Sequence, residues 1–132
     1  MRENPLTLPV KYSISRTQAT PVRRHVLTLD LRDDPAAIAA YREHHQRVWP
    51  EVVESLRQAG VHRMEILMLG RRLVMILELN DGLDFRRVFA THLASNPRVQ
   101  EWEQLMRSLQ QPSSDAPPGE WWAVMDPVFR LS

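Results

Sequence analysis

Two apolar segments in the middle of the chain, VHRMEILML at 61–69 and LVMILEL at 73–79, constrain the fold more than any other feature. Each has the length and apolar content of a strand. Only Gly70, Arg71 and Arg72 separate them, and so short a connection forces two strands to pair antiparallel. The sequence therefore predicts a β-hairpin, and the rest of the chain has to be arranged around an antiparallel sheet.

A strand and a helical region precede this hairpin. In RRHVLTLDL the three leucines alternate with other residues, so they fall on one face of a strand. Asp33 or Asp34 can then cap a helix that begins with Pro35, a residue suited to the first helical position. Pro50 interrupts the helical pattern, so we expect a kink or a restart there, and Gly60 is a natural helix end. The residues that recur at helical spacing are Ile38, Tyr41, His45, Val48 and Val52.

Helical periodicity returns after the hairpin. GLDFRRVFATHLAS and RVQEWEQLMRSL place apolar residues every three or four positions, and an Asn-Pro dipeptide separates them. QPSSDAPPG is typical of a loop. EWWAVMDPVFRL has the content of a last strand, in which Trp121 and Trp122 alternate faces and Pro127 must lie at an edge or a bulge. The order βαββαβ, with the second helical region split, predicts an α+β, ferredoxin-like fold.

The predicted sheet has one face that the chain leaves uncovered. The helices of a ferredoxin-like fold lie on one side, while the other side here still carries apolar residues. Because large exposed apolar faces are sites of association, a second copy of the chain is the simplest cover. We therefore expect a homodimer packed sheet to sheet.

Composition excludes several kinds of protein. The length of 132 residues fits one domain, and the absence of cysteine excludes disulfides, thiol nucleophiles and thiolate metal sites. No run of about 18 apolar residues is present, so we expect no membrane partner and a cytoplasmic location. The histidines lie on separate elements, apart from the adjacent His44 and His45, which point in different directions, and no glycine-rich phosphate loop exists. We expect no metal and no cofactor.

Charge is distributed unevenly along the chain. Residues 1–24 carry five basic residues against Glu3 alone, whereas the whole chain has a net charge of +1. A nucleic-acid-binding protein would carry its basic residues on the folded part, so we expect no nucleic-acid partner. Residues 1–22 are typical of a flexible basic tail, although a targeting peptide has a similar composition. The folded domain is expected over residues 23–132.

The residues best suited to chemistry lie in YREHHQRVWPEV, residues 41–52. Tyr41 and His45 are four apart, as are His45 and Trp49, so all three can share one helix face. Histidine can take and give a proton near neutral pH, while a phenol suits sugar hydroxyls and an indole suits the C–H face of a pyranose. A histidine on an apolar stripe can equally be a core residue with a hydrogen-bond partner. The residues alone leave both hypotheses open.

From residue 23 to residue 132 the chain resembles the L-rhamnose mutarotase family. The resemblance is carried by YREHHQRVWPEV, GVHRMEIL, QEWEQLM and the closing VFRL, and PGEWWAVM is similar to the L-fucose-associated members. It implies a dimeric ferredoxin-like α/β barrel that interconverts the α and β anomers of a 6-deoxy-sugar without metal or organic cofactor. It also implies that His45 is the acid/base residue and that Tyr41 and Trp102 contact the sugar.

The chain departs from the family pattern at three positions. Met64 stands where the family usually has a tyrosine, and Glu103 stands in place of the second tryptophan of a pair, so two sugar contacts change character. Pro127 replaces an acidic residue, for which Asp126 is a neighbouring substitute. Glu103 has two possible interpretations. It is a functional residue that accepts hydrogen bonds from sugar hydroxyls or acts as a second proton carrier, or it is a solvated surface charge.

Together these observations predict a mutarotase for a free 6-deoxy-hexose, L-fucose or L-rhamnose. His45 is the expected catalytic residue, and the expected substrate-binding residues are Tyr41, Met64, Trp102 and Glu103. The alternative is a non-catalytic or differently specific small-ligand-binding protein with the same dimeric α/β-barrel fold.

Overall fold

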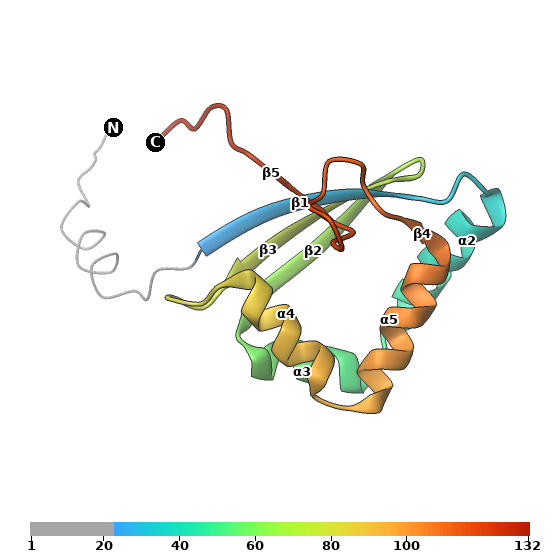
Figure 1. Cartoon of the computed structure of the whole chain (residues 1–132), viewed down its shortest axis with the longest axis horizontal. Coiled ribbons are helices and arrows are strands. Elements are labelled where there is room, and N and C mark those ends of the chain that lie inside the picture. The colour runs from blue at the N-terminus through green and yellow to red at the C-terminus, as the bar shows by residue number, and fades with distance from the viewer. Residues whose placement is uncertain (1–22) are drawn as a thin grey trace, which may run out of the picture.

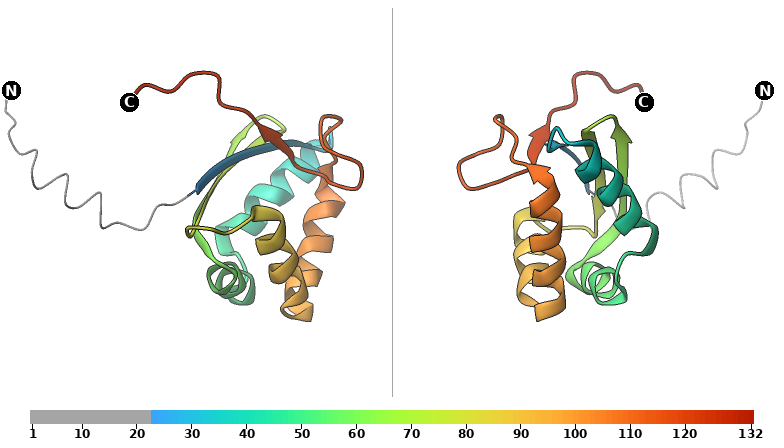
Figure 2. Two further views of the ribbon diagram at one scale, coloured as in Figure 1. Left: turned by 60° about the vertical axis from the view of Figure 1, so that its left-hand side comes forward. Right: turned by 90° about the vertical axis from the view of Figure 1, so that its right-hand side faces the viewer.

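The computed structural model describes residues 23–132, which form a curled antiparallel sheet with helices on one face (Figures 1 and 2). This arrangement confirms the predicted α+β, ferredoxin-like fold. The predicted basic tail, residues 1–22, lies outside the described residues. The elements are β1 (Arg23–Leu31), α2 (Pro35–His44), a 3₁₀ turn (His45–Arg47), α3 (Pro50–Ala59), β2 (Val61–Leu69), β3 (Arg72–Leu79), α4 (Phe85–Ala94), α5 (Pro97–Leu109), β4 (Gln110–Gln111) and β5 (Ala123–Met125).

The sheet is built on the predicted hairpin. Strands β2 and β3 pair antiparallel, β3 pairs with β1, and the opposite edge of β1 pairs with both β4 and β5. Partners in an antiparallel ladder share a face of the sheet. Leu27 lies opposite Met75, and Leu29 lies opposite Leu73; all four are buried against the helices. The alternation of leucines in β1 therefore marked the inner face correctly.

The predicted last strand is wrong in its length. The sequence indicated a strand over residues 120–131, but only Ala123–Met125 pair with β1, and the residues after them leave the sheet (Figure 1). Pro127 has no N–H to donate, which accounts for the early end of the ladder. The two-residue strand β4 after α5 was not predicted, because Gln110 and Gln111 carry no strand periodicity.

Local signals set the boundaries of α2 and α3 as predicted. The Asp34 carboxylate accepts a hydrogen bond from the Ala36 N–H at 3.0 Å, and Pro35 is the first residue of α2. The helix ends at His44 and the chain restarts as α3 at Pro50, because the proline ring cannot continue the preceding helical turn. At the end of α3, Gly60 has φ 112°, and a Cβ there would lie 2.2 Å from Leu83 Cδ1. The positive φ favours glycine, and any larger residue would also have to displace the Leu83 side chain.

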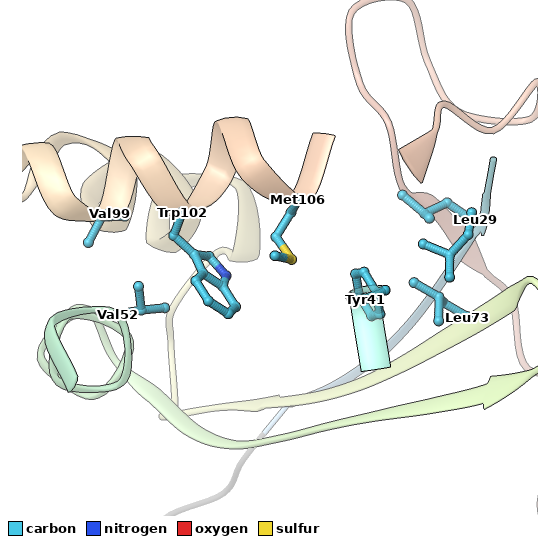
Figure 3. Packing of buried hydrophobic residues seen from close by; sticks show 8 residues of the cluster. Leu29, Tyr41, Val52, Leu73, Val99, Trp102 and Met106 are labelled. Atoms are coloured by element: carbon cyan, nitrogen blue, oxygen red, sulfur yellow. The ribbon is translucent and has the colours of Figure 1, made fainter. Parts of the chain in front are cut away.

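The core lies between the inner face of the sheet and the helices. Figure 3 shows Trp102 and Met106 extending from α5 toward Tyr41 of α2, with Leu29 and Leu73 of the sheet beside Tyr41. These side chains are at most 7% exposed. Between residues 23 and 132, no helix has the length and apolar character needed to cross a membrane.

Candidate active site

A cavity of about 710 Å³ opens between the sheet and the helices. Its lining comes mainly from α2 and the turn after it, α3, β2, β3 and α5. The five predicted site residues come together on its wall: Tyr41, His45, Met64, Trp102 and Glu103. Residues from three separate parts of the chain thus meet at one space large enough for a monosaccharide.

His45 lies where α2 ends and the 3₁₀ turn begins, so the interruption before Pro50 presents it at a helix terminus. Its Nδ1 lies 2.8 Å from the Tyr41 carbonyl oxygen. Because a carbonyl can only accept, Nδ1 donates the proton, and the neutral ring keeps a lone pair on Nε2. The ring is half-buried. His45 therefore has the partner expected of a structural histidine while it also lines the cavity.

Burial lowers the pKa of His45 below the ordinary 6.5, because a charged imidazolium loses solvation there. The hydrogen bond to the Tyr41 carbonyl partly opposes this shift, and the nearby charge of His44 adds to it. The ring is consequently neutral at pH 7. In that state Nε2 can act as a base.

Aromatic rings hold His45 in place. The Tyr41 ring stacks on it at a centroid distance of 4.1 Å, and the Trp102 ring meets it edge-on at 5.3 Å. Trp49 packs edge-on against Trp102 at 5.1 Å and is covered by the Arg98 guanidinium at 3.8 Å, but it does not line the cavity. Trp49 therefore supports Trp102, rather than sharing the histidine's surface as its spacing suggested.

Tyr41 is almost fully buried, with 3% of its surface exposed. Burial raises the pKa of its phenol well above 10, so the hydroxyl stays protonated at physiological pH. A protonated phenol can both donate and accept a hydrogen bond. Tyr41 thus offers the cavity a neutral polar group.

The two unusual positions lie on opposite sides of the cavity. Met64 of β2 is half-buried and packs against the core around Leu77 and Val61. Glu103 of α5 is ion-paired with Arg107 at 3.0 Å, one helical turn away. Its side chain is 38% exposed, which places it at the rim of the cavity. Asp126, the suggested substitute for an acidic residue, is exposed and does not line the cavity.

Several lining residues were missed as site residues from the sequence, among them His92, Met106 and Gln110. His92 shares the apolar stripe of α4 with Val88, and that spacing could have shown that it faces inward. Trp122 also lines the cavity. Its neighbour Trp121 does not, and its ring lies beside the Arg107 guanidinium at 5.1 Å. Within residues 23–132, no group of three or more potential ligand side chains is arranged to hold a metal ion.

Comparisons with known proteins identify the family of the chain. The sequence model of the L-rhamnose mutarotase family matches residues 24–131. The L-fucose mutarotase of Xanthomonas campestris is 42% identical over 113 residues, which cover 84% of this chain and 90% of that protein. The L-rhamnose mutarotase of Burkholderia ambifaria is 28% identical over 98 residues, covering 74% of this chain and 89% of that protein.

A solved structure shows the same fold. The crystal structure of the L-rhamnose mutarotase FA22100 from Formosa agariphila superimposes with a TM-score of 0.59 at 22% identity, covering 83% of this chain and 99% of that one. The match of the family model over nearly all of the described residues decides the assignment. The chain belongs to the L-rhamnose mutarotase family.

Proposed function

We propose that the chain interconverts the α and β anomers of a free 6-deoxy-hexose, either L-fucose or L-rhamnose, in the cytoplasm. The observation that carries the proposal is the hydrogen bond from His45 Nδ1 to the Tyr41 carbonyl, which leaves a basic Nε2 on a sugar-sized cavity. L-fucose is the first candidate, because the relative at 42% identity is named an L-fucose mutarotase.

The reaction needs only one proton carrier. Nε2 of His45 takes the proton from the anomeric hydroxyl O1 while an O1 lone pair forms the C1=O1 bond. The electrons of the C1–O5 bond pass to O5, which receives a proton from the imidazolium. The open aldehyde turns about C1–C2, and the reverse steps close the ring on its other face. No proton or electron is gained or lost overall, so no co-reactant is required.

The surrounding residues hold the sugar against this base. The Tyr41 hydroxyl, kept protonated by burial, is suited to bond a ring hydroxyl. The Trp102 indole provides an apolar plate for the C–H face of the sugar. We assign Glu103 the role of accepting hydrogen bonds from sugar hydroxyls at the rim, and Met64 that of an apolar contact.

Exchange NMR tests the proposed function. Saturation of one anomeric proton of L-fucose or L-rhamnose should transfer to the other anomer faster with the protein than without it, and a D-hexose serves as the comparison. Acceleration on a 6-deoxy-sugar supports the mutarotase. Binding without acceleration on any sugar would instead favour the non-catalytic alternative.

The kcat/KM of the exchange is expected to depend on pH through His45. Because burial places the folded pKa below 6.5, the base form dominates from about pH 6.5 upward, and the rate falls as pH drops through that lowered pKa. Two other titratable groups act on the ring directly, Tyr41, which stacks on it, and His44, whose charge lowers its pKa; Glu103 of α5 lines the same cavity. His44→Ala removes a charge that lowers the pKa of His45, so it should move the fall to higher pH. A rate that rises on acidification after background subtraction would contradict this assignment.

We also propose that two copies associate through the outer face of the sheet. This face carries Val26, Val74 and Ile76 at its centre, with the more exposed Leu67 and Met125 toward its edges. Beyond β5, three further apolar side chains of the C-terminal segment are 79–98% exposed: Val128, Phe129 and Leu131. So much apolar surface on one side of a small protein is typical of an interface between subunits.

Ile76→Lys is expected to convert the dimer into a monomer, because the new charge would be buried at the centre of the interface. Multi-angle light scattering after gel filtration measures the change in mass. Ala90→Lys, on the exposed side of α4, is the matched control and should leave the dimer intact. A wild-type protein that elutes as a monomer would contradict the proposed association.

A further inference from the structure

A polar cluster joins α3 to α4 and includes one residue of the cavity wall, His92. Ser55 Oγ lies 2.7 Å from His92 Nδ1 and 2.7 Å from Ser95 Oγ. Ser95 Oγ also donates to the His92 carbonyl oxygen at 2.7 Å. Ser55 is 4% exposed and His92 is 7% exposed, so their mutual hydrogen bond is buried, whereas Ser95 is exposed at the end of α4. The mechanism above uses none of the three residues.

The hydrogen atoms available in the cluster fix the tautomer of His92. The Ser95 hydroxyl donates its single proton to the His92 carbonyl, so the Ser55 hydroxyl must donate to Ser95 Oγ. Ser55 Oγ then has only a lone pair left for the imidazole. All three contacts form together only when His92 Nδ1 carries the proton and donates it to Ser55. Nε2 of the neutral ring is consequently an acceptor.

Nε2 is the ring nitrogen of His92 that is available to a ligand in the cavity, because Nδ1 is bonded to Ser55. His92 is the one residue of α4 among those that line it, and no partner within residues 23–132 is bonded to Nε2. The neighbouring lining residues from α3 and β2 include the apolar Val52, Leu56 and Val61. Burial also lowers the pKa of His92, so the ring stays neutral and keeps its lone pair.

We propose that His92 is a specificity-determining residue, whose Nε2 accepts a hydrogen bond from one hydroxyl of the bound sugar. The inference rests on the proposed function and concerns the same cavity. A neutral acceptor held rigidly in an apolar wall favours a sugar that presents a hydroxyl at that point and disfavours one that does not, because the acceptor would then be left unpaired. His92 positions the substrate and carries no proton in the reaction.

Deletion of substrate hydroxyls, combined with substitution of His92, tests the proposal. Exchange rates are measured for L-fucose and its 2-, 3- and 4-deoxy forms, or for the same series of L-rhamnose if that sugar is the one accelerated. For the wild-type protein, loss of the hydroxyl that His92 contacts should lower kcat/KM by roughly ten- to a hundredfold, mainly through KM. The kcat/KM of His92→Leu should fall by a similar factor on the sugar that keeps all its hydroxyls. Removal of that hydroxyl from the sugar should then cause no further fall in kcat/KM.

Two further variants separate recognition from a structural role. His92→Gln returns an amide acceptor near the position of Nε2 and should recover part of the lost KM. Ser55→Ala removes the hydrogen bond that fixes the tautomer of His92. It should therefore raise KM severalfold while kcat stays near the wild-type value. If folded His92→Leu keeps the wild-type response at every hydroxyl, the proposal is overturned, and Ser55 and His92 only join the helices. If no sugar is accelerated, the proposed function fails, and the same comparison of hydroxyls is made from sugar binding followed by NMR.

Discussion

His45→Ala is expected to lower the kcat of anomer exchange by about 10²- to 10⁴-fold, the usual contribution of a positioned acid/base residue. The expectation follows from the tautomer: the Tyr41 carbonyl holds the proton on Nδ1, so Nε2 is the basic nitrogen of a residue that lines the cavity. Alanine leaves no group at that point that can carry a proton from O1 to O5. Saturation-transfer NMR at pH 7 measures the rate, after subtraction of the uncatalysed exchange.

His44→Ala is the matched control, because it removes the same side chain from the adjacent position. His44 does not line the cavity, and its ring meets the edge of Trp102 at 6.4 Å. We expect this variant to retain most of the activity at pH 7. The His45 substitution removes one side-chain hydrogen bond, worth about 1 kcal/mol, so the protein should still fold and associate. Equal losses in both variants, or an unfolded His45→Ala, would show that His45 is a structural residue.

Much of the fold follows from local signals that the sequence displays directly. The short link at Gly70 forces the β2–β3 hairpin, the pair Asp34 and Pro35 starts α2, and Pro50 and Gly60 bound α3. Each of these residues acts on the backbone within a few positions of itself, so its effect does not depend on distant parts of the chain. The end of the sheet is different. Whether residues after 120 pair with β1 depends on the edge that β1 offers, and only three of them do so.

The candidate site likewise has one part that the sequence predicts and another part that it does not. Tyr41 and His45 are one turn apart on a helix, so their proximity is visible in the sequence, and the family resemblance adds Trp102. His92 reaches the cavity through packing of α4 on α3, and its partner Ser55 lies 37 positions away. No spacing rule connects two such residues. The alternation of Trp121 and Trp122 predicts only that their rings point to opposite sides, so it cannot show which ring enters the cavity. Their burial does not distinguish them either, because both are half-buried.

Trp102→Ala is expected to reduce the free energy of unfolding by about 3–5 kcal/mol, the usual cost of removing a large buried aromatic side chain. Trp102 is 7% exposed and contacts both His45 and Trp49, so its loss leaves a void between α5 and the helices of the opposite wall. Urea denaturation at fixed protein concentration measures the change, because an associating protein has a concentration-dependent stability.

Two substitutions separate the structural part of this effect from the functional part. Trp121→Ala removes the same side chain from a half-buried position beside Arg107, and it should cost clearly less stability because part of that ring already contacts water. Trp102→Phe keeps an aromatic ring in the core, so the fold should largely survive while KM rises, since the smaller plate covers less of the sugar. If Trp102→Ala were as stable as Trp121→Ala, then α5 would not be anchored by this residue, and the cavity wall that presents His45 would have to be held by other contacts.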